Sequence, residues 1–193
     1  MKPKINFRKI NEFERNLIFK TLENISSNFS LFLDENKSSL YISFNKSDSN
    51  DKYPSVLLIS AELNELIDKS KFKNNIMSAG VYFGFVKNNK FFLSLEGAEL
   101  LHNFRIVNDN NYIYVNDEAE KAVLYGNPIR KEMITSVSKD LKKESLLLIF
   151  NLSNELISIA QSLVNYENYQ KTTTKETIAI NLVDKGYYLR KKQ

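Results

Sequence analysis

The stretch DEAEKAVLYGNPIRKEMI, residues 117–134, sets the plan of the C-terminal half of the chain, because it contains the end of one element and the start of the next. Asn116 or Asp117 can cap a helix whose first turn is acidic, which suits the positive end of the helix dipole. Gly126 stands where a helix closes with a left-handed residue, and Pro128 has no amide with which to continue it. The pattern therefore predicts a helix, a turn and then a strand.

The rest of the C-terminal half alternates short apolar runs with polar turns. Turn residues at 153–155 and 184–186 each separate two apolar runs, which is typical of β-hairpins. The predicted strands comprise residues 112–115, 129–137, 146–152, 156–164, 178–183 and 187–189. Residues 165–176 are polar and are predicted to form a loop. Six strands and one helix are enough for a small closed or half-closed barrel with few exposed edges.

The N-terminal half has the pattern of an antiparallel sheet covered by two or three helices. Apolar residues recur at three- and four-residue steps over 11–28, and Ser60 can cap a helix that ends near residue 71. A short helix is predicted over 94–102. Apolar runs predict strands at 30–34, 40–44, 56–59, 81–86 and 90–95, with the first two and the last two paired as hairpins.

A polar run, Asn108-Asp109-Asn110-Asn111, separates these two sets of elements. Such a run is typical of a linker, since it offers no apolar side chain to a core. The sequence therefore predicts two domains, residues 1–107 and 112–193, and the α+β fold class.

Several short motifs resemble known families. LYGN after a short acidic helix is similar to the PUA domain, an RNA-binding module. The order and spacing of the upstream motifs resemble the Nip-seven family of large-ribosomal-subunit biogenesis factors. These motifs are AGVYFGF (79–85), KFFLSL (90–95), AELL (98–101), LYGN (124–127) and DKGYYLR (184–190).

The resemblance implies a pre-PUA domain followed by a small mixed β-barrel of PUA type with one helix. It also implies a non-catalytic RNA-binding protein that assists ribosomal RNA maturation. Its partners would be ribosomal RNA or its precursor, in single-stranded segments, and other ribosome-assembly or RNA-processing proteins. The chain departs from the family where Glu132-Met133-Ile134 replaces the usual glycines. If a glycine there lets the backbone approach RNA, the contact surface of this chain must differ.

The composition of the chain excludes several classes of enzyme active site. The chain of 193 residues has no Cys and a single His, His102, so it lacks the ligands of a conventional zinc site and a thiol nucleophile. We expect no catalysis, no cofactor and no metal, with His102 a packed residue. No apolar run reaches the length of a membrane span, and no apolar segment follows the charged N-terminus. We therefore expect a cytoplasmic protein, or a nuclear or nucleolar one in a eukaryote, without membrane contact.

The formal charge of +4 permits a polyanionic partner without requiring one. Lys185 lies in the turn before the last predicted strand, and Lys171 and Lys175 precede the strand before it, so a barrel would bring them to neighbouring edges. The predicted RNA-contacting residues are Arg190, Lys191, Lys185, Lys171 and Lys175, extended by Arg130 and Lys131. A basic N-terminal cluster of Lys2, Lys4, Arg8 and Lys9 is the alternative.

Aromatic residues have two interpretations. Those of the hairpin at 82–92 could stack on bases, but alternating aromatics on a hairpin are more often core. Tyr166, Tyr169, Tyr187 and Tyr188 lie near basic residues and are better stacking candidates. Two other functions stay open: a protein interaction adaptor that docks through the N-terminal sheet, and an RNA-modifying enzyme subunit.

Overall fold

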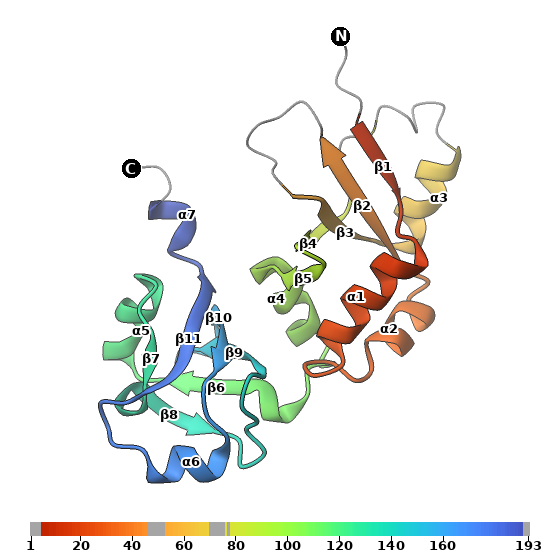
Figure 1. Cartoon of the computed structure of the whole chain (residues 1–193). Coiled ribbons are helices and arrows are strands. Elements are labelled where there is room, and N and C mark those ends of the chain that lie inside the picture. Colours follow the sequence, from red (N-terminus) through yellow and green to blue (C-terminus); the bar gives the residue numbers. More distant parts are fainter. Residues whose placement is uncertain (1–4, 46–52, 70–75, 77, 191–193) are drawn as a thin grey trace. The chain divides into compact units, whose positions relative to one another are not determined.

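The structure is a computed structural model that describes residues 5–45, 53–69, 76 and 78–190. The chain divides into two compact units, Met1–Ile106 and Val107–Gln193, each with its own sheet (Figure 1). Asn111, in the predicted linker, is fully buried and its side chain donates to the Leu146 carbonyl of the C-terminal unit. That residues 1–107 and 112–193 fold independently as two domains stays a prediction, which limited proteolysis tests.

The N-terminal unit is an antiparallel sheet with helices, as predicted, although its described residues form four helices where two or three were expected. Its strands follow the order β1-β2-β3-β4-β5. The elements are β1 (Ile5–Lys9), α1 (Glu12–Leu22), α2 (Phe29–Glu35), β2 (Ser39–Asn45), β3 (Ser55–Ile59), α3 (Ala61–Lys69), β4 (Val81–Lys87), β5 (Lys90–Leu93) and α4 (Leu95–Asn103). The hairpin of β4 and β5 is confirmed, and its turn residues Asn88 and Asn89 both have positive φ, at 49° and 56°.

Two N-terminal predictions were wrong. Residues 30–34 form part of α2 instead of a strand, because Phe29, Phe32 and Leu33 recur at helical spacing and are all buried. The predicted hairpin of 30–34 with 40–44 is therefore absent. Strand β2 pairs instead with β3 and with β1, a strand that the sequence analysis did not predict.

Helices lie on both faces of the N-terminal sheet. Ile67 of α3 belongs to a cluster with Tyr41, Leu57 and Ile59 on one face. On the other face, the Phe83 ring stacks on Phe29 of α2, with centroids 5.2 Å apart. Alternation along the strands thus supplies two apolar surfaces, one for α3 and the other for α2 and its neighbours.

The C-terminal unit is a nearly closed mixed barrel, as predicted. Its six strands follow the order β7-β11-β10-β9-β6-β8, with β6 and β9 parallel and the other pairs antiparallel. The elements are η2 (Asp109–Asn111), β6 (Tyr112–Val115), α5 (Asp117–Leu124), β7 (Ile129–Arg130), η3 (Lys131–Met133), β8 (Ile134–Val137), β9 (Leu146–Phe150), β10 (Leu156–Ser162), α6 (Tyr166–Lys171), β11 (Thr177–Asp184) and α7 (Tyr187–Arg190).

The predicted strand at 129–137 is two strands at opposite edges of the sheet. The 3₁₀ turn η3 separates β7 from β8, and these strands pair with β11 and β6 respectively. One short stretch of sequence thus supplies both edges, which is how the sheet comes close to closure. The helix predicted in the opening motif is α5, and its Ala119 and Val123 are buried in the barrel core.

Two further helices occupy stretches that were predicted differently. Residues 187–189, predicted as a strand, belong to α7, and the predicted loop at 165–176 contains α6. Asn165 caps α6 by accepting from the Asn168 amide at 2.9 Å. No helix among the described residues is long and apolar enough to cross a membrane.

Candidate nucleic-acid interface

Helix α5 ends in a turn that exposes backbone and aromatic groups. The Asn116 side chain accepts from the Ala119 amide at 2.8 Å and so caps the helix start. At the other end, Gly126 has φ +83°, and the Asn127 amide donates to the Ala122 carbonyl at 3.1 Å. Tyr125 is 62% exposed in this turn. The predicted helix stop is therefore confirmed.

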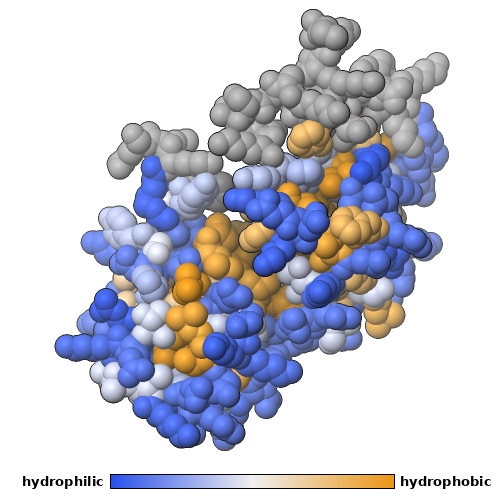
Figure 2. Space-filling view, in the orientation of Figure 1, coloured by the Kyte–Doolittle hydropathy of each residue, from blue (hydrophilic) through white to orange (hydrophobic). Residues whose placement is uncertain are grey.

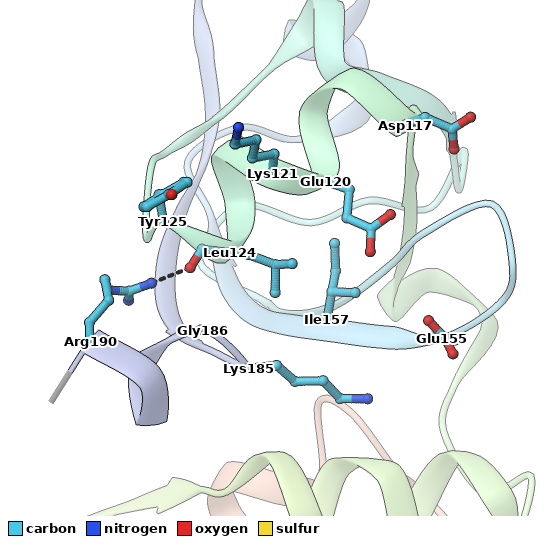
Figure 3. Close-up of a pocket in the computed structure, with 10 residues that line it drawn as sticks. All are labelled: Asp117, Glu120, Lys121, Leu124, Tyr125, Glu155, Ile157, Lys185, Gly186 and Arg190. Carbon is cyan, nitrogen blue, oxygen red and sulfur yellow. Dashed lines mark hydrogen bonds between the residues drawn. The ribbon is translucent and has the colours of Figure 1, made fainter. Parts of the chain in front are cut away.

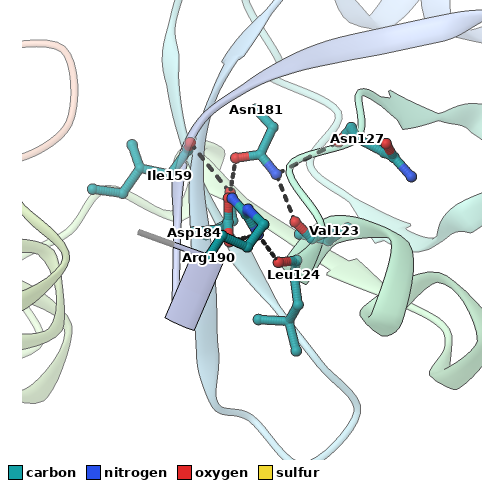
Figure 4. A network of polar contacts seen from close by, with 8 residues as sticks. Val123, Leu124, Asn127, Ile159, Asn181, Asp184 and Arg190 are labelled. Carbon is teal, nitrogen blue, oxygen red and sulfur yellow. Dashed lines mark hydrogen bonds and ion pairs between the residues drawn. The ribbon is translucent and has the colours of Figure 1, made fainter. Parts of the chain in front are cut away.

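An arginine ties the C-terminal helix α7 to the end of α5. Arg190 donates to both carboxylate oxygens of Asp184, at 3.0 and 2.8 Å, and also to the Leu124 carbonyl (Figure 4). Asp184 is only 3% exposed, so the guanidinium neutralises a buried charge. The hydrogen bond to Asp184 raises the pKa of Arg190. We call Arg190, Asp184 and the Leu124 carbonyl the arginine clamp.

Neighbouring polar groups hold the same two segments together. The Asn181 side chain donates to the Val123 carbonyl at 2.8 Å and accepts from Ser158 Oγ at 2.9 Å. A Cβ atom on Gly186 would lie 2.0 Å from the Leu124 carbonyl oxygen, so only glycine fits there. The end of β11 is thus fixed closely against the end of α5.

A pocket of about 700 Å³ lies beside the clamp, with Leu124 and Ile157 as its apolar residues (Figure 3). Figure 3 shows Tyr125 and Arg190 at one end and Asp117 and Glu155 at the other. Its charged lining residues are Asp117, Glu120, Lys121, Glu155, Lys185 and Arg190. The lining balances three acids with three cations, so the pocket suits a polar ligand better than an anion alone.

Six of the seven predicted cations fall into two groups at opposite ends of β11. Lys185 and Arg190 lie at the end of the strand and line the pocket, and we call this group the Asp184 end. Lys191 lies outside the described residues, as do Lys2 and Lys4 of the alternative cluster. The remaining four, Arg130, Lys131, Lys171 and Lys175, lie near the start of the strand, and we call them the Thr177 end.

Backbone pairing assembles the Thr177 end. Arg130 is the cross-strand partner of Thr177, and the Lys131 amide donates to the Glu176 carbonyl at 3.1 Å. Lys131 Nζ donates to the carbonyls of Gln170 and Thr172, at 3.2 and 2.8 Å, where it complements the negative end of α6. Lys131 is therefore a structural cation.

The other three cations of the Thr177 end point into solvent. Arg130, Lys171 and Lys175 are exposed, and the contact of Arg130 with Glu132 is long, at 3.8 Å. Exposed cations keep their hydration and can exchange it for phosphate contacts. These three side chains are therefore available to a polyanion.

The outer surface of β11 between the two ends is apolar. Ile180 and Leu182 are 45% and 49% exposed, and Figure 2 shows hydrophobic residues gathered on the face of this unit that β11 crosses. An eight-residue strand separates the two ends by about 23 Å, at roughly 3.3 Å per residue. A ligand that touches both ends must therefore be extended.

The other sequence candidates have mixed outcomes. Tyr166 and Tyr169 stack on each other and pack against the barrel core, while Tyr187 is 41% exposed. The side chain of Tyr188 lies outside the described part of the structure. His102 is half-buried, and burial lowers its pKa.

Two pocket residues, Lys121 and Tyr125, were not predicted from the sequence. Tyr125 belongs to the LYGN motif and Lys121 lies three residues before it, so the motif was the available signal. The described residues contain no group of three or more His, Asp or Glu side chains that could hold a metal ion.

Two family models match the chain in sequence order. The model for the NIP7/UPF0113 pre-PUA domain matches residues 7–95, and the model for the UPF0113 PUA domain matches residues 111–193. The chain belongs to the NIP7/UPF0113 family. Membership accounts for both units of this NIP7/UPF0113 protein.

A curated relative of this NIP7/UPF0113 protein is the 60S ribosome subunit biogenesis protein nip7 of Schizosaccharomyces pombe. It is 24% identical over 119 residues, which are 61% of this chain and 64% of the relative, so less than two thirds of the relative is spanned. Among solved structures, a conserved PUA domain protein from Thermoplasma acidophilum has a TM-score of 0.58 at 14% identity, covering 97% of this chain and 99% of that one. A hypothetical protein from Pyrococcus horikoshii has a TM-score of 0.60 at 8% identity, covering 93% and 94%. These structures share the fold.

Proposed function

We propose that this chain is a non-catalytic RNA-binding protein that assists ribosomal RNA maturation and large-subunit ribosome biogenesis. The observation that carries the proposal is the match to a pre-PUA domain followed by a PUA domain, together with a relative named as a 60S biogenesis protein. The partners would be ribosomal RNA or its precursor and other assembly proteins. The place of action would be the cytoplasm, or the nucleus and nucleolus in a eukaryote.

The contact surface that we propose runs along β11. Arg130, Lys171 and Lys175 of the Thr177 end would hold phosphates, because they are exposed and lie on segments that the β7–β11 pairing and the Lys131 side chain hold together. At the Asp184 end, Lys185 is exposed, whereas Arg190 is held by the clamp and would act mainly by keeping the pocket in shape. Lys131 would add positive potential to the Thr177 end, and Lys191, which lies outside the described residues, stays a predicted RNA contact.

The absence of catalysis is part of the proposal. His102 lies on α4 of the N-terminal unit and is half-buried, with a pKa lowered by burial. A general acid or base requires a reachable substrate atom and a partner that sets its pKa. The residues that line the pocket beside the clamp include carboxylates, lysines, an arginine and the Tyr125 phenol, but no serine or threonine hydroxyl and no thiol.

An adaptor function is the second candidate, favoured by apolar side chains on the N-terminal unit. Phe13, Leu31 and Leu66 are 59%, 55% and 65% exposed. Leu66 lies on α3 and Leu31 on α2, which cover opposite faces of the sheet, so these side chains offer separate contact points for a protein and not one continuous patch. An adaptor would bind its protein partner in the absence of RNA.

Titration of the intact chain with labelled RNA tests the proposal. We expect single-stranded uridine-rich or mixed RNA to bind more tightly than a duplex of the same length, because unpaired bases can stack on side chains. The logarithm of the affinity should fall linearly with the logarithm of the salt concentration. No measurable binding to either RNA at low salt would overturn the proposal and leave the adaptor.

A further inference from the structure

Three aromatic rings form a column across one face of the N-terminal sheet. The Tyr53 and Phe85 rings have centroids 5.9 Å apart with 28° between their planes, and Phe85 and Phe92 are 5.0 Å apart at 10°. Phe85 and Phe92 are cross-strand partners, so they share a face. Their spacing matches the distance between neighbouring strands, so the column runs across β4 to the edge strand β5. We call Tyr53, Phe85 and Phe92 the aromatic column.

The column is on the α3 face of the sheet but is not buried. Ser55 lies two residues before Leu57 of the α3 cluster, so the two side chains point to the same face of the sheet. Phe85 is the cross-strand partner of Ser55 and therefore also lies on the α3 face. Tyr53 is 37% exposed and Phe92 is 39% exposed. Phe83 and Phe91, the aromatics that pack toward the other face, are fully buried. Phe83 and Phe91 therefore belong to the core, whereas the rings of the aromatic column stay partly exposed to solvent.

Two lysines lie beside the exposed rings. Lys87 and Lys90 are direct cross-strand partners, and like charges at such positions repel. Lys87 Nζ also lies 4.7 Å from the centroid of the Tyr53 ring. An anion at this end of the hairpin would relieve the repulsion. The surface thus combines flat apolar rings with a site for negative charge.

We infer that the aromatic column binds unpaired bases of single-stranded RNA. A base stacks against Phe92, where the column ends at the sheet edge, and the adjoining phosphates lie at Lys87 and Lys90. Bases and phosphates alternate in this way along a single strand of RNA. A protein partner with an aromatic anchor would stack on the rings but would bring no negative charge to the paired lysines. The inference rests on the proposed function and adds a second RNA surface, in the unit that the PUA match does not cover.

A fluorescent reporter at Phe92 tests this inference directly. The chain has no Trp, so Phe92→Trp introduces a single indole whose emission responds to a stacked base. Phe13→Trp is the matched control, because Phe13 is exposed on α1 of the same unit. Both variants are titrated with uridine-rich single-stranded RNA and with polyphosphate, which has the charge but no bases. In parallel, RNA affinity is measured for Phe92→Ala and Phe13→Ala.

We expect RNA, but not polyphosphate, to quench Phe92→Trp in a saturable manner, with no change in Phe13→Trp. Phe92→Ala should weaken RNA binding by about 5- to 100-fold, the range for loss of one stacked base, and Phe13→Ala should not. If the intact chain binds RNA but Phe92→Trp emission and Phe92→Ala affinity are unchanged, the column is not an RNA site and the proposed function survives. An equal response to polyphosphate overturns base stacking. If the intact chain binds no RNA, both proposals fall. If Phe92→Trp does not fold, the affinity of Phe92→Ala decides.

Discussion

The two ends of β11 use cations differently, although both lie on one strand of one barrel. At the Asp184 end, Arg190 neutralises a buried carboxylate and binds the end of α5, so its charge is paired within the protein. At the Thr177 end, only Lys131 is used in this way, and three further cations remain exposed. A cluster of basic residues in a sequence therefore does not distinguish cations that hold the fold from cations that are offered to a partner.

Gly186→Ala should have the largest effect on stability. The added methyl group would meet the Leu124 carbonyl oxygen at 2.0 Å, so α5 and β11 must separate, at a loss of about 2–3 kcal/mol in unfolding free energy. Gly126→Ala is the control: its methyl group would meet Arg190 at 3.2 Å, and its positive φ costs about 1 kcal/mol. Urea unfolding followed by circular dichroism measures both. A loss for Gly186→Ala no larger than that for Gly126→Ala would contradict the close approach.

Breaking the clamp should destabilise the C-terminal unit in a non-additive manner. Arg190→Gln leaves the buried Asp184 carboxylate without its ion pair. The urea midpoint of this single variant should therefore fall below that of the double variant Arg190→Gln, Asp184→Asn. The double variant removes the unpaired charge together with its partner. Urea midpoints of the two singles and the double give the cycle. Additive losses would show that the two side chains act independently.

Lys131→Met should have a smaller and local effect. Loss of the ammonium group at the end of α6 should reduce stability by about 0.3–1 kcal/mol and loosen residues 166–172. Hydrogen exchange of those amides should accelerate, while β9 and β10 stay protected. Lys175→Met, on the same surface without these hydrogen bonds among the described contacts, serves as the control. Equal exchange in the two variants would mean that Lys131 does not hold α6.

His102→Ala should leave RNA affinity unchanged, the smallest effect of the series. Burial lowers the pKa of His102, opposed by the charge of Glu99, so a proton titration should place its midpoint below the ordinary histidine range. The folded state then favours the neutral ring, and the stability that this adds above the unfolded pKa is lost as pH falls through the folded value. A loss of RNA affinity or function in a folded His102→Ala protein would reopen the enzyme hypothesis.

Much of the fold could be predicted from local patterns in the sequence. The helix and turn at LYGN, the hairpin at Asn88-Asn89, and the strands β9, β10 and β11 follow from caps, positive-φ residues and apolar runs. Helix α2 was missed because Phe29, Leu31 and Leu33 also alternate like a strand, and only tertiary packing of Phe29 on Phe83 settles the choice. The split of 129–137 into two edges depends on barrel closure, which no local pattern encodes.

The candidate site was predicted less well. Lys185 and Arg190 do line one pocket, but the predicted neighbourhood of Arg190 with Lys171 and Lys175 required a final strand that is a helix. The clamp could not be predicted because Asp184 becomes buried only when the end of β11 meets the end of α5. Its Arg190 and Leu124 are 66 residues apart in the sequence. Charge and spacing indicated which residues are basic, while burial decides which of them stay available.

The salt dependence of RNA binding is the most direct test of the central claim that exposed cations at the Thr177 end contact single-stranded RNA. The variant Arg130→Gln, Lys171→Gln, Lys175→Gln is compared with Lys139→Gln, Lys142→Gln, Lys143→Gln, which removes the same charge from exposed positions of the same unit. Each phosphate contact on a single strand adds about 0.7 to the slope of log affinity against log salt. We predict that the first variant flattens the slope by about 2 and weakens binding, and that the control changes neither. A folded first variant with the slope and affinity of the unmodified chain would contradict the account.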